Sequence, residues 1–144
     1  MKLKKHSKIL IGIVVAVLLL TGITAGYLQS YYHTDTQAVS AYQYKQNSDT
    51  KIQTKMLSDG SIVCEPENPA AGFIFYPGGK VETSAYEPLM QACAAQDILC
   101  VLVSMPFHLA VFDKNAADGI QEQYPQIDSW YIGGHSLGGA MAAS

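Results

Sequence analysis

A serine stands at the centre of a glycine-rich run near the end of the chain. The run reads Gly133-Gly134-His135-Ser136-Leu137-Gly138-Gly139-Ala140 and contains the pattern G-x-S-x-G. In this pattern a sharp turn between a strand and a helix lifts the serine hydroxyl clear of a sheet. Glycines two residues to either side are needed because the two backbones come too close for a Cβ. Ser136 is therefore a candidate nucleophile for acyl transfer, and Gly134, His135 and Gly138 form the turn around it.

Two other interpretations of this run are a turn in which the serine only caps a helix, and a phosphate-binding loop. The pattern G-x-x-x-x-G-K-[ST] of phosphate-binding loops does not occur in the sequence. The glycine spacing also differs from the G-x-G-x-x-G of dinucleotide-binding turns. A nucleophile turn is favoured because the β-prone segment Trp130-Tyr131-Ile132 enters the run and small residues suited to a helix leave it.

Short apolar runs alternate with helix-length segments in the second half of the chain. Strands are predicted over residues 72–76, 98–104 and 129–132, and helices over residues 86–96, 115–124 and from 137 onward. Strands that are apolar on both faces and joined by helices form a parallel sheet covered on both sides. Earlier, the runs 51–57 and 61–65 flank Ser58-Asp59-Gly60, which favours a hairpin. We expect an α/β fold in which this hairpin precedes a parallel sheet with flanking helices.

These features resemble the α/β-hydrolase superfamily, in particular its small dienelactone-hydrolase-like esterases. The resemblance covers roughly residues 62–144 and rests on the run 134–140 and on the strand 73–76 leading into Pro77-Gly78-Gly79. Many relatives have His-Gly-Gly there, so Pro77 departs from the pattern, and without the resemblance the segment is also compatible with an ordinary turn. The resemblance implies an oxyanion hole formed by the backbone N–H of Leu137 and that of Gly79, with Lys80 as the alternative.

The superfamily orders its catalytic residues as serine, then Asp or Glu, then His. Residues 137–144 include no Asp, Glu or His. The resemblance therefore implies a chain about twice as long, truncated here after the nucleophile turn, and little activity in residues 1–144, because a serine without its base is a poor nucleophile. His135 is expected to make a structural hydrogen bond. His108, after the strand 98–104, can approach the site or, more typically, pack within its loop.

The N-terminal segment has the length and composition of a membrane span. Residues 9–28 carry no charged side chain, and they follow Lys2, Lys4, Lys5 and Lys8. About twenty apolar residues in a helix span about 30 Å, the thickness of a bilayer's hydrocarbon core. Positive flanks stay in the cytoplasm, so the rest of the chain is expected outside it. The alternative is a signal peptide cleaved near Ala25 or Gly26, which would secrete the remainder.

The net charge and the cysteine content exclude several classes of partner and cofactor. Without the four leading lysines, five Lys stand against twelve Asp and Glu, a net charge of −7 (5 − 12), and the chain has no Arg. An acidic surface repels phosphate backbones, so nucleic acid is not an expected partner. Cys64, Cys93 and Cys100 lack metal-ligand spacing, and the last two are expected to be buried as small apolar residues. Neither a metal nor an organic cofactor is expected.

The sequence thus predicts three regions. They are a basic tip with a transmembrane signal-anchor (1–28), a juxtamembrane stalk (29–50) and the N-terminal half of an α/β-hydrolase domain (51–144). We predict a membrane-anchored serine hydrolase that acts outside the cytoplasm on a small-molecule ester or related acyl bond through an acyl-enzyme. The alternative is a membrane-tethered, non-catalytic binding protein that keeps the hydrolase fold, or a remnant without function.

Overall fold

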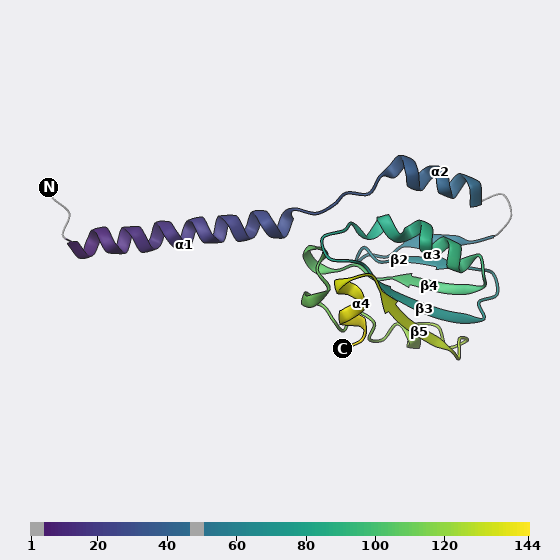
Figure 1. Ribbon diagram of the computed structural model, residues 1–144. Helices are drawn as coiled ribbons and strands as arrows, with labels where there is room; N and C mark the ends of the chain where they lie inside the picture. Colours follow the sequence, from purple (N-terminus) through teal and green to yellow (C-terminus); the bar gives the residue numbers. More distant parts are fainter. Residues whose placement is uncertain (1–4, 47–50) are drawn as a thin grey trace. The chain divides into compact units, whose positions relative to one another are not determined.

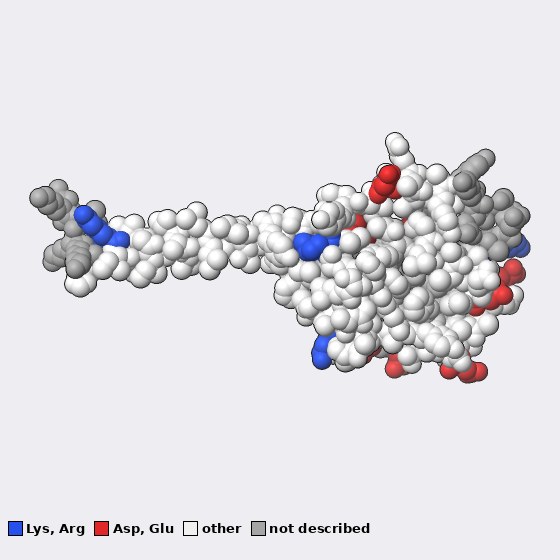
Figure 2. All heavy atoms as spheres, viewed as in Figure 1, with Lys and Arg blue, Asp and Glu red and all other residues white. Residues whose placement is uncertain are grey.

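The computed structural model describes residues 5–46 and 51–144, which divide between Ser30 and Tyr31 into two compact units. The first unit holds helix α1 (Lys5–Gln29). Its residues His6–Gln29 are long and apolar enough to cross a membrane, a test that a signal sequence also passes. Figure 2 shows basic side chains near the start of α1. Lys2 and Lys4, on which the predicted orientation partly depends, lie outside the described residues.

The second unit is built on a five-stranded sheet (Figure 1). Its strands are β1 (Gln53–Met56), β2 (Ile62–Glu65), β3 (Ala71–Tyr76), β4 (Ile98–Leu102) and β5 (Trp130–Gly134). They lie in the order β1-β2-β4-β3-β5. β3 pairs in parallel with β4 and β5, whereas β2 pairs antiparallel with β1 and β4. The predicted α/β fold is confirmed, but the predicted hairpin (β1 and β2) extends the same sheet, which is therefore mixed.

Both faces of the sheet are covered. On one face α3 (Glu87–Ala94), with α2 (Thr36–Gln46) beside it, packs over a buried cluster of Ile62, Cys64, Phe75, Met90, Ala94, Cys100 and Leu102. On the other face the segment between β4 and β5, together with α4 (Leu137–Ala142), packs over Val63, Ile74, Tyr76, Leu99, Val101, Val103, Met105, Ala110, Ile120 and Ile127. Neighbours such as Ile74 and Phe75 enter opposite clusters because strand side chains alternate in direction. This explains why the central strands are apolar on both faces.

The α-helix predicted over residues 115–124 is wrong. The backbone there makes successive turns with hydrogen bonds between residues three apart, and it ends in the 3-10 helix η4 (Gln121–Gln123). Gly119 has a φ of 75°, which an α-helix does not allow. The hydroxyl of Tyr76, a buried residue of β3, accepts the N–H of Ala117 at 2.9 Å. This backbone group is therefore satisfied by a distant side chain instead of by a helical carbonyl.

The chain just after α1 pairs with the loop that follows β3. Tyr32 forms a parallel bridge with Val81. Its N–H donates to the carbonyl of Lys80 at 2.7 Å, and its carbonyl accepts the N–H of Glu82 at 3.0 Å. Of the region predicted as a stalk (29–50), Gln29 and Ser30 thus belong to the first unit and the residues from Tyr31 onward to the compact second unit, while its last four residues lie outside the described part of the chain.

Candidate active site

The turn between β5 and α4 holds Ser136 in a backbone conformation that is rare for serine. β5 ends at Gly134 and α4 begins at Leu137, so two residues make the turn. Ser136 has a φ of 51° and a ψ of −120°, and it is exposed. A non-glycine residue in such a region costs about 1–3 kcal/mol and is found mainly where the fold requires it for function. An exposed serine at this turn can reach a bound substrate.

Glycines allow the turn to close against the end of β3. A Cβ on Gly134 would lie 2.5 Å from the carbonyl oxygen of Tyr76. A Cβ on Gly138 would collide with the carbonyl oxygens of Tyr76 and Pro77. The N–H of His135 donates to the same Tyr76 carbonyl at 3.1 Å. Glycine is required at both outer positions of G-x-S-x-G because backbone atoms, which cannot rotate away, occupy the space of a side chain.

The loop after β3 lies beside this turn and brings a second amide to it. A Cβ on Gly79 would lie 3.0 Å from Cδ2 of Leu137, so the two loops are in direct contact. Within residues 5–46 and 51–144, no group accepts the backbone N–H of Gly79 or of Leu137. The N–H of Lys80, by contrast, donates to the carbonyl of His108 at 2.7 Å. Of the two predicted alternatives, only Gly79 keeps its N–H available for a developing negative charge.

The family model of the "Alpha/beta hydrolase family" matches residues 72–144, which contain both loops. The chain belongs to the alpha/beta hydrolase family. Among solved structures, this chain is similar to a Pyrobaculum calidifontis esterase (monoclinic form), with 18% sequence identity and a TM-score of 0.48. The similarity covers 74% of this chain and 43% of that one, so the chain spans less than half of the esterase's length. No curated protein matches it.

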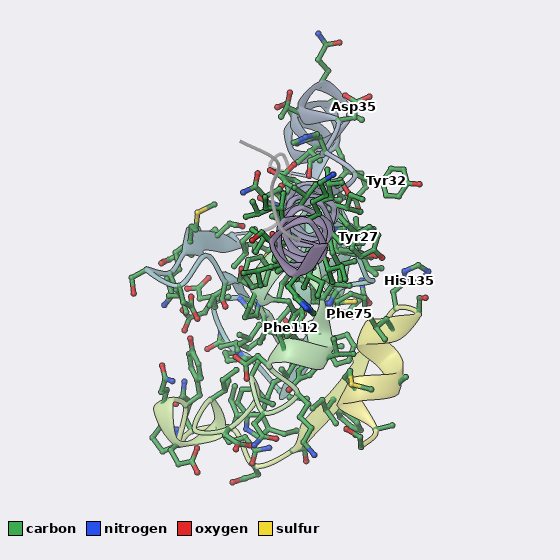
Figure 3. The ribbon with its side chains drawn as sticks, turned by 90° about the vertical axis from the view of Figure 1, so that its left-hand side faces the viewer. Tyr27, Tyr32, Asp35, Phe75, Phe112 and His135 are labelled. Atoms are coloured by element: carbon green, nitrogen blue, oxygen red, sulfur yellow. The ribbon has the colours of Figure 1, made fainter. Side chains whose placement is uncertain are left out.

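Next to the candidate nucleophile, His135 makes the hydrogen bond that the sequence predicted. Its Nδ1 lies 2.9 Å from the hydroxyl of Tyr86, and Figure 3 places His135 at the start of α4. The same hydroxyl accepts the N–H of Gly78 at 3.1 Å. Tyr86 ends the 3-10 helix η1 (Thr83–Tyr86) and was not predicted as a site residue. It belongs to no motif, and only the fold brings it to the turn.

His108 packs within its loop and makes no hydrogen bond to Ser136. It ends the short 3-10 helix η2 (Pro106–His108), which precedes another, η3 (Ala110–Phe112). Its ring lies on that of Tyr31 with centroids 3.9 Å apart, and its Nδ1 has no partner among the described residues. Burial lowers the pKa of His108 below its usual value. The loop-packing alternative from the sequence therefore describes this histidine better than a place at the site.

The segment before α2 braces the loop that carries Gly79. The N–H of Thr34 donates to the carboxylate of Glu82 at 2.7 Å, and the hydroxyls of Thr34 and Ser84 lie 2.7 Å apart. The hydrogen bond from the Thr34 N–H is the main reason why the pKa of Glu82 is lowered. Together with the bridge at Tyr32, these bonds fix the backbone directly after Gly79.

The cysteines lie away from this turn, and the two buried ones are poor nucleophiles. Cys64 and Cys100 face each other on β2 and β4 and are buried, whereas Cys93 on α3 is only partly buried, in contrast to its prediction. Burial raises the pKa of Cys64 to about 11 and also raises that of Cys100. Because the thiolate is the reactive form, these two thiols are inert at neutral pH.

Proposed function

We propose that the protein is a serine hydrolase that cleaves an ester or related acyl bond through an acyl-enzyme, in the manner of carboxylesterases. One observation carries the proposal. Ser136 is exposed at a strained turn, and beside it Leu137 and Gly79 each have a backbone N–H with no acceptor among the described residues. Acyl transfer needs a nucleophile and oxyanion donors on the same side of the substrate.

In the proposed reaction, Oγ of Ser136 bonds to the carbonyl carbon while a general base takes the hydroxyl proton. The carbonyl oxygen becomes negative and is held by the N–H groups of Leu137 and Gly79. The bond to the leaving alcohol then breaks, and the base returns the proton to that alcohol. Water repeats these steps on the acyl-enzyme and releases the acid. By the family resemblance, the base is a His that follows an Asp or Glu, both later in the sequence than Ser136.

A fluorophosphonate probe tests this proposal on the protein expressed from its complete reading frame. We expect the probe to label the wild type and not the variant S136A. We also expect S136A to lose about 10⁴-fold or more of the turnover of p-nitrophenyl esters. A series of acyl chain lengths then defines the substrate pocket. A folded wild-type protein that neither reacts with the probe nor hydrolyses esters would instead support the non-catalytic binding protein.

We further propose that α1 anchors the protein in a membrane, with the hydrolase unit outside the cytoplasm. The length of the apolar helix supports this, as do the basic residues that precede its uncharged stretch, residues 9–28. N-terminal sequencing of the mature protein, together with detergent extraction, is the test. A retained anchor gives an N-terminus at or near Met1 in the membrane fraction. A new N-terminus near Gly26 in the soluble fraction would show cleavage and secretion instead.

A further inference from the structure

The hydroxyl of Tyr86 joins the two loops that carry the proposed oxyanion donors. It accepts the N–H of Gly78 at 3.1 Å and lies 2.9 Å from Nδ1 of His135. Gly78 is covalently bonded to Gly79 in one loop. His135 is covalently bonded to Ser136 in the other. One oxygen atom thus connects the residue before a proposed donor with the residue before the proposed nucleophile.

We infer that Tyr86 is a positioning residue, whose hydroxyl sets the spacing between the nucleophile turn and the loop of Gly79. The inference rests on the proposed function, since it gives Tyr86 a role in the oxyanion hole of that reaction. Tyr86 does not itself contact the reacting atoms. It acts through Gly78 and His135, and its loss should alter where the N–H of Gly79 lies relative to Ser136.

The hydrogen-bonding capacity of the three groups matches this role. The backbone N–H of Gly78 can only donate, so the tyrosine oxygen is its acceptor. The hydroxyl proton is then free for Nδ1 of His135, which accepts it when the imidazole carries its own proton on Nε2. The tyrosine oxygen accepts one hydrogen bond while its proton is donated in the other, so a single hydroxyl bonds to both loops.

Packing leaves this connection little freedom. A Cβ on Gly78 would lie 2.6 Å from Nδ1 of His135 and 2.7 Å from the Tyr86 oxygen, so both side chains close over the glycine. The ring of Tyr86 packs against that of Phe75, with ring centroids 5.2 Å apart, and against the buried cluster that α3 covers. The hydroxyl is therefore held at one position. A phenylalanine at position 86 would keep the packing of the ring and lose the two hydrogen bonds.

The variant Y86F removes this oxygen and keeps the ring. We expect kcat for ester hydrolysis to fall about 10- to 100-fold, because a displacement of about 1 Å in an active site can cost about 10²-fold, while KM changes less than about twofold. S61A is a matched control outside the site. The buried Ser61 hydroxyl also makes two hydrogen bonds, accepting the Ser104 N–H at 3.0 Å and donating to the Asp59 carboxylate at 3.0 Å. S61A should lower the melting temperature and leave kcat near that of the wild type.

A thionoester substrate separates positioning from a general structural effect. The sulfur of its tetrahedral intermediate accepts hydrogen bonds poorly, so the preference for the oxygen ester over the thionoester reports on the oxyanion donors. We expect this preference to shrink in Y86F and to be unchanged in S61A. If Y86F does not fold, H135F tests the same connection, since it removes Nδ1 and keeps an aromatic ring.

The possible outcomes are distinct. A wild-type kcat or a wild-type oxygen preference in folded Y86F overturns the role of Tyr86, while S136A still defines the hydrolase. If the wild type shows no hydrolysis that depends on Ser136, the proposed function fails and the role of Tyr86 fails with it. A fall in kcat with a reduced oxygen preference, reproduced in H135F, supports the inference.

Discussion

Gly79 and Leu137 meet at the ends of two neighbouring strands, where a Cβ on Gly79 would lie 3.0 Å from Cδ2 of Leu137 and 3.5 Å from its Cβ. Gly79 follows β3 and Leu137 follows β5, and the two strands pair in parallel with Tyr76 opposite Gly134. Parallel neighbours end at the same edge of a sheet, so the register of β3 and β5 brings the two proposed oxyanion donors together.

The contact predicts that Gly79→Ala impairs catalysis. The new Cβ comes closer to Cδ2 of Leu137 than an ordinary contact, so the end of that side chain or the loop of Gly79 must shift by a few tenths of an ångström, and we expect kcat to fall by up to about 10-fold. Steady-state kinetics on an ester, with the melting temperature as a check on folding, measure this effect.

A double-mutant cycle tests the cause. Leu137→Ala removes Cδ2 and keeps the backbone N–H, so the double variant G79A/L137A should regain part of the activity lost in G79A. Strictly additive losses in the double variant would mean that the Leu137 side chain is not what makes alanine harmful at position 79.

The conformation of Ser136 predicts opposite effects on stability and activity. Its φ of 51° suits glycine better than serine. Ser136→Gly should therefore raise the free energy of unfolding by about 1 kcal/mol while abolishing hydrolysis. Urea denaturation measures the gain. Ser136→Ala is the control, because it removes the hydroxyl and keeps the Cβ; an equal gain in both variants would assign the cost to the hydroxyl and not to the backbone.

The bridge at Tyr32 predicts that the segment after α1 supports the site. Tyr32→Pro removes the N–H that donates to the Lys80 carbonyl at 2.7 Å, and a lost hydrogen bond of this kind costs about 1 kcal/mol. We expect lower kcat and faster proteolysis after Lys80. Tyr32→Ala keeps the N–H and removes only a side chain that is 76% exposed, so it should behave as wild type. Similar losses in both variants would point to the side chain instead.

Burial of His108 predicts a loss of stability in mild acid. Its pKa is lowered in the folded protein, so the unfolded chain binds the proton first as the pH falls through about 6.5. The free energy of unfolding therefore has its full value above that pH and decreases below it. Desolvation is the main cause; Lys80 and His33 act in the same direction, and Glu82 opposes them. Melting temperatures should fall between pH 7 and pH 5.

His108→Asn is the matched variant for this prediction. Asparagine tolerates the φ of 56° at this position and does not titrate in this range. Its melting temperature should depend less on pH between 7 and 5. Glu82 does not affect this comparison. Its pKa is lowered in the folded protein, so the stability that its ionised form contributes is lost only below the usual pKa range of carboxylates. An unchanged pH profile in the variant would show that another group is responsible.

Local patterns in the sequence predicted much of this structure. The G-x-S-x-G run predicted the turn at Ser136, and the apolar runs predicted the three parallel strands. Such features depend on residues close in sequence, because glycine geometry and strand burial act over a few positions. The same reasoning failed for residues 115–124, where Gly119 and the distant Tyr76 hydroxyl direct the backbone into turns.

The sequence by itself determined the α/β fold, the candidate nucleophile and the apolar N-terminal helix. Tertiary structure alone decided which amides stay free beside Ser136: the carbonyl of His108 accepts the Lys80 N–H, while the Gly79 N–H has no acceptor within the described part of the chain. It also decided the place of Tyr86, 49 residues before His135 in the chain. The physical reason is that a hydrogen bond depends on distance in space, and the packing of strands and loops sets that distance where no local pattern records it.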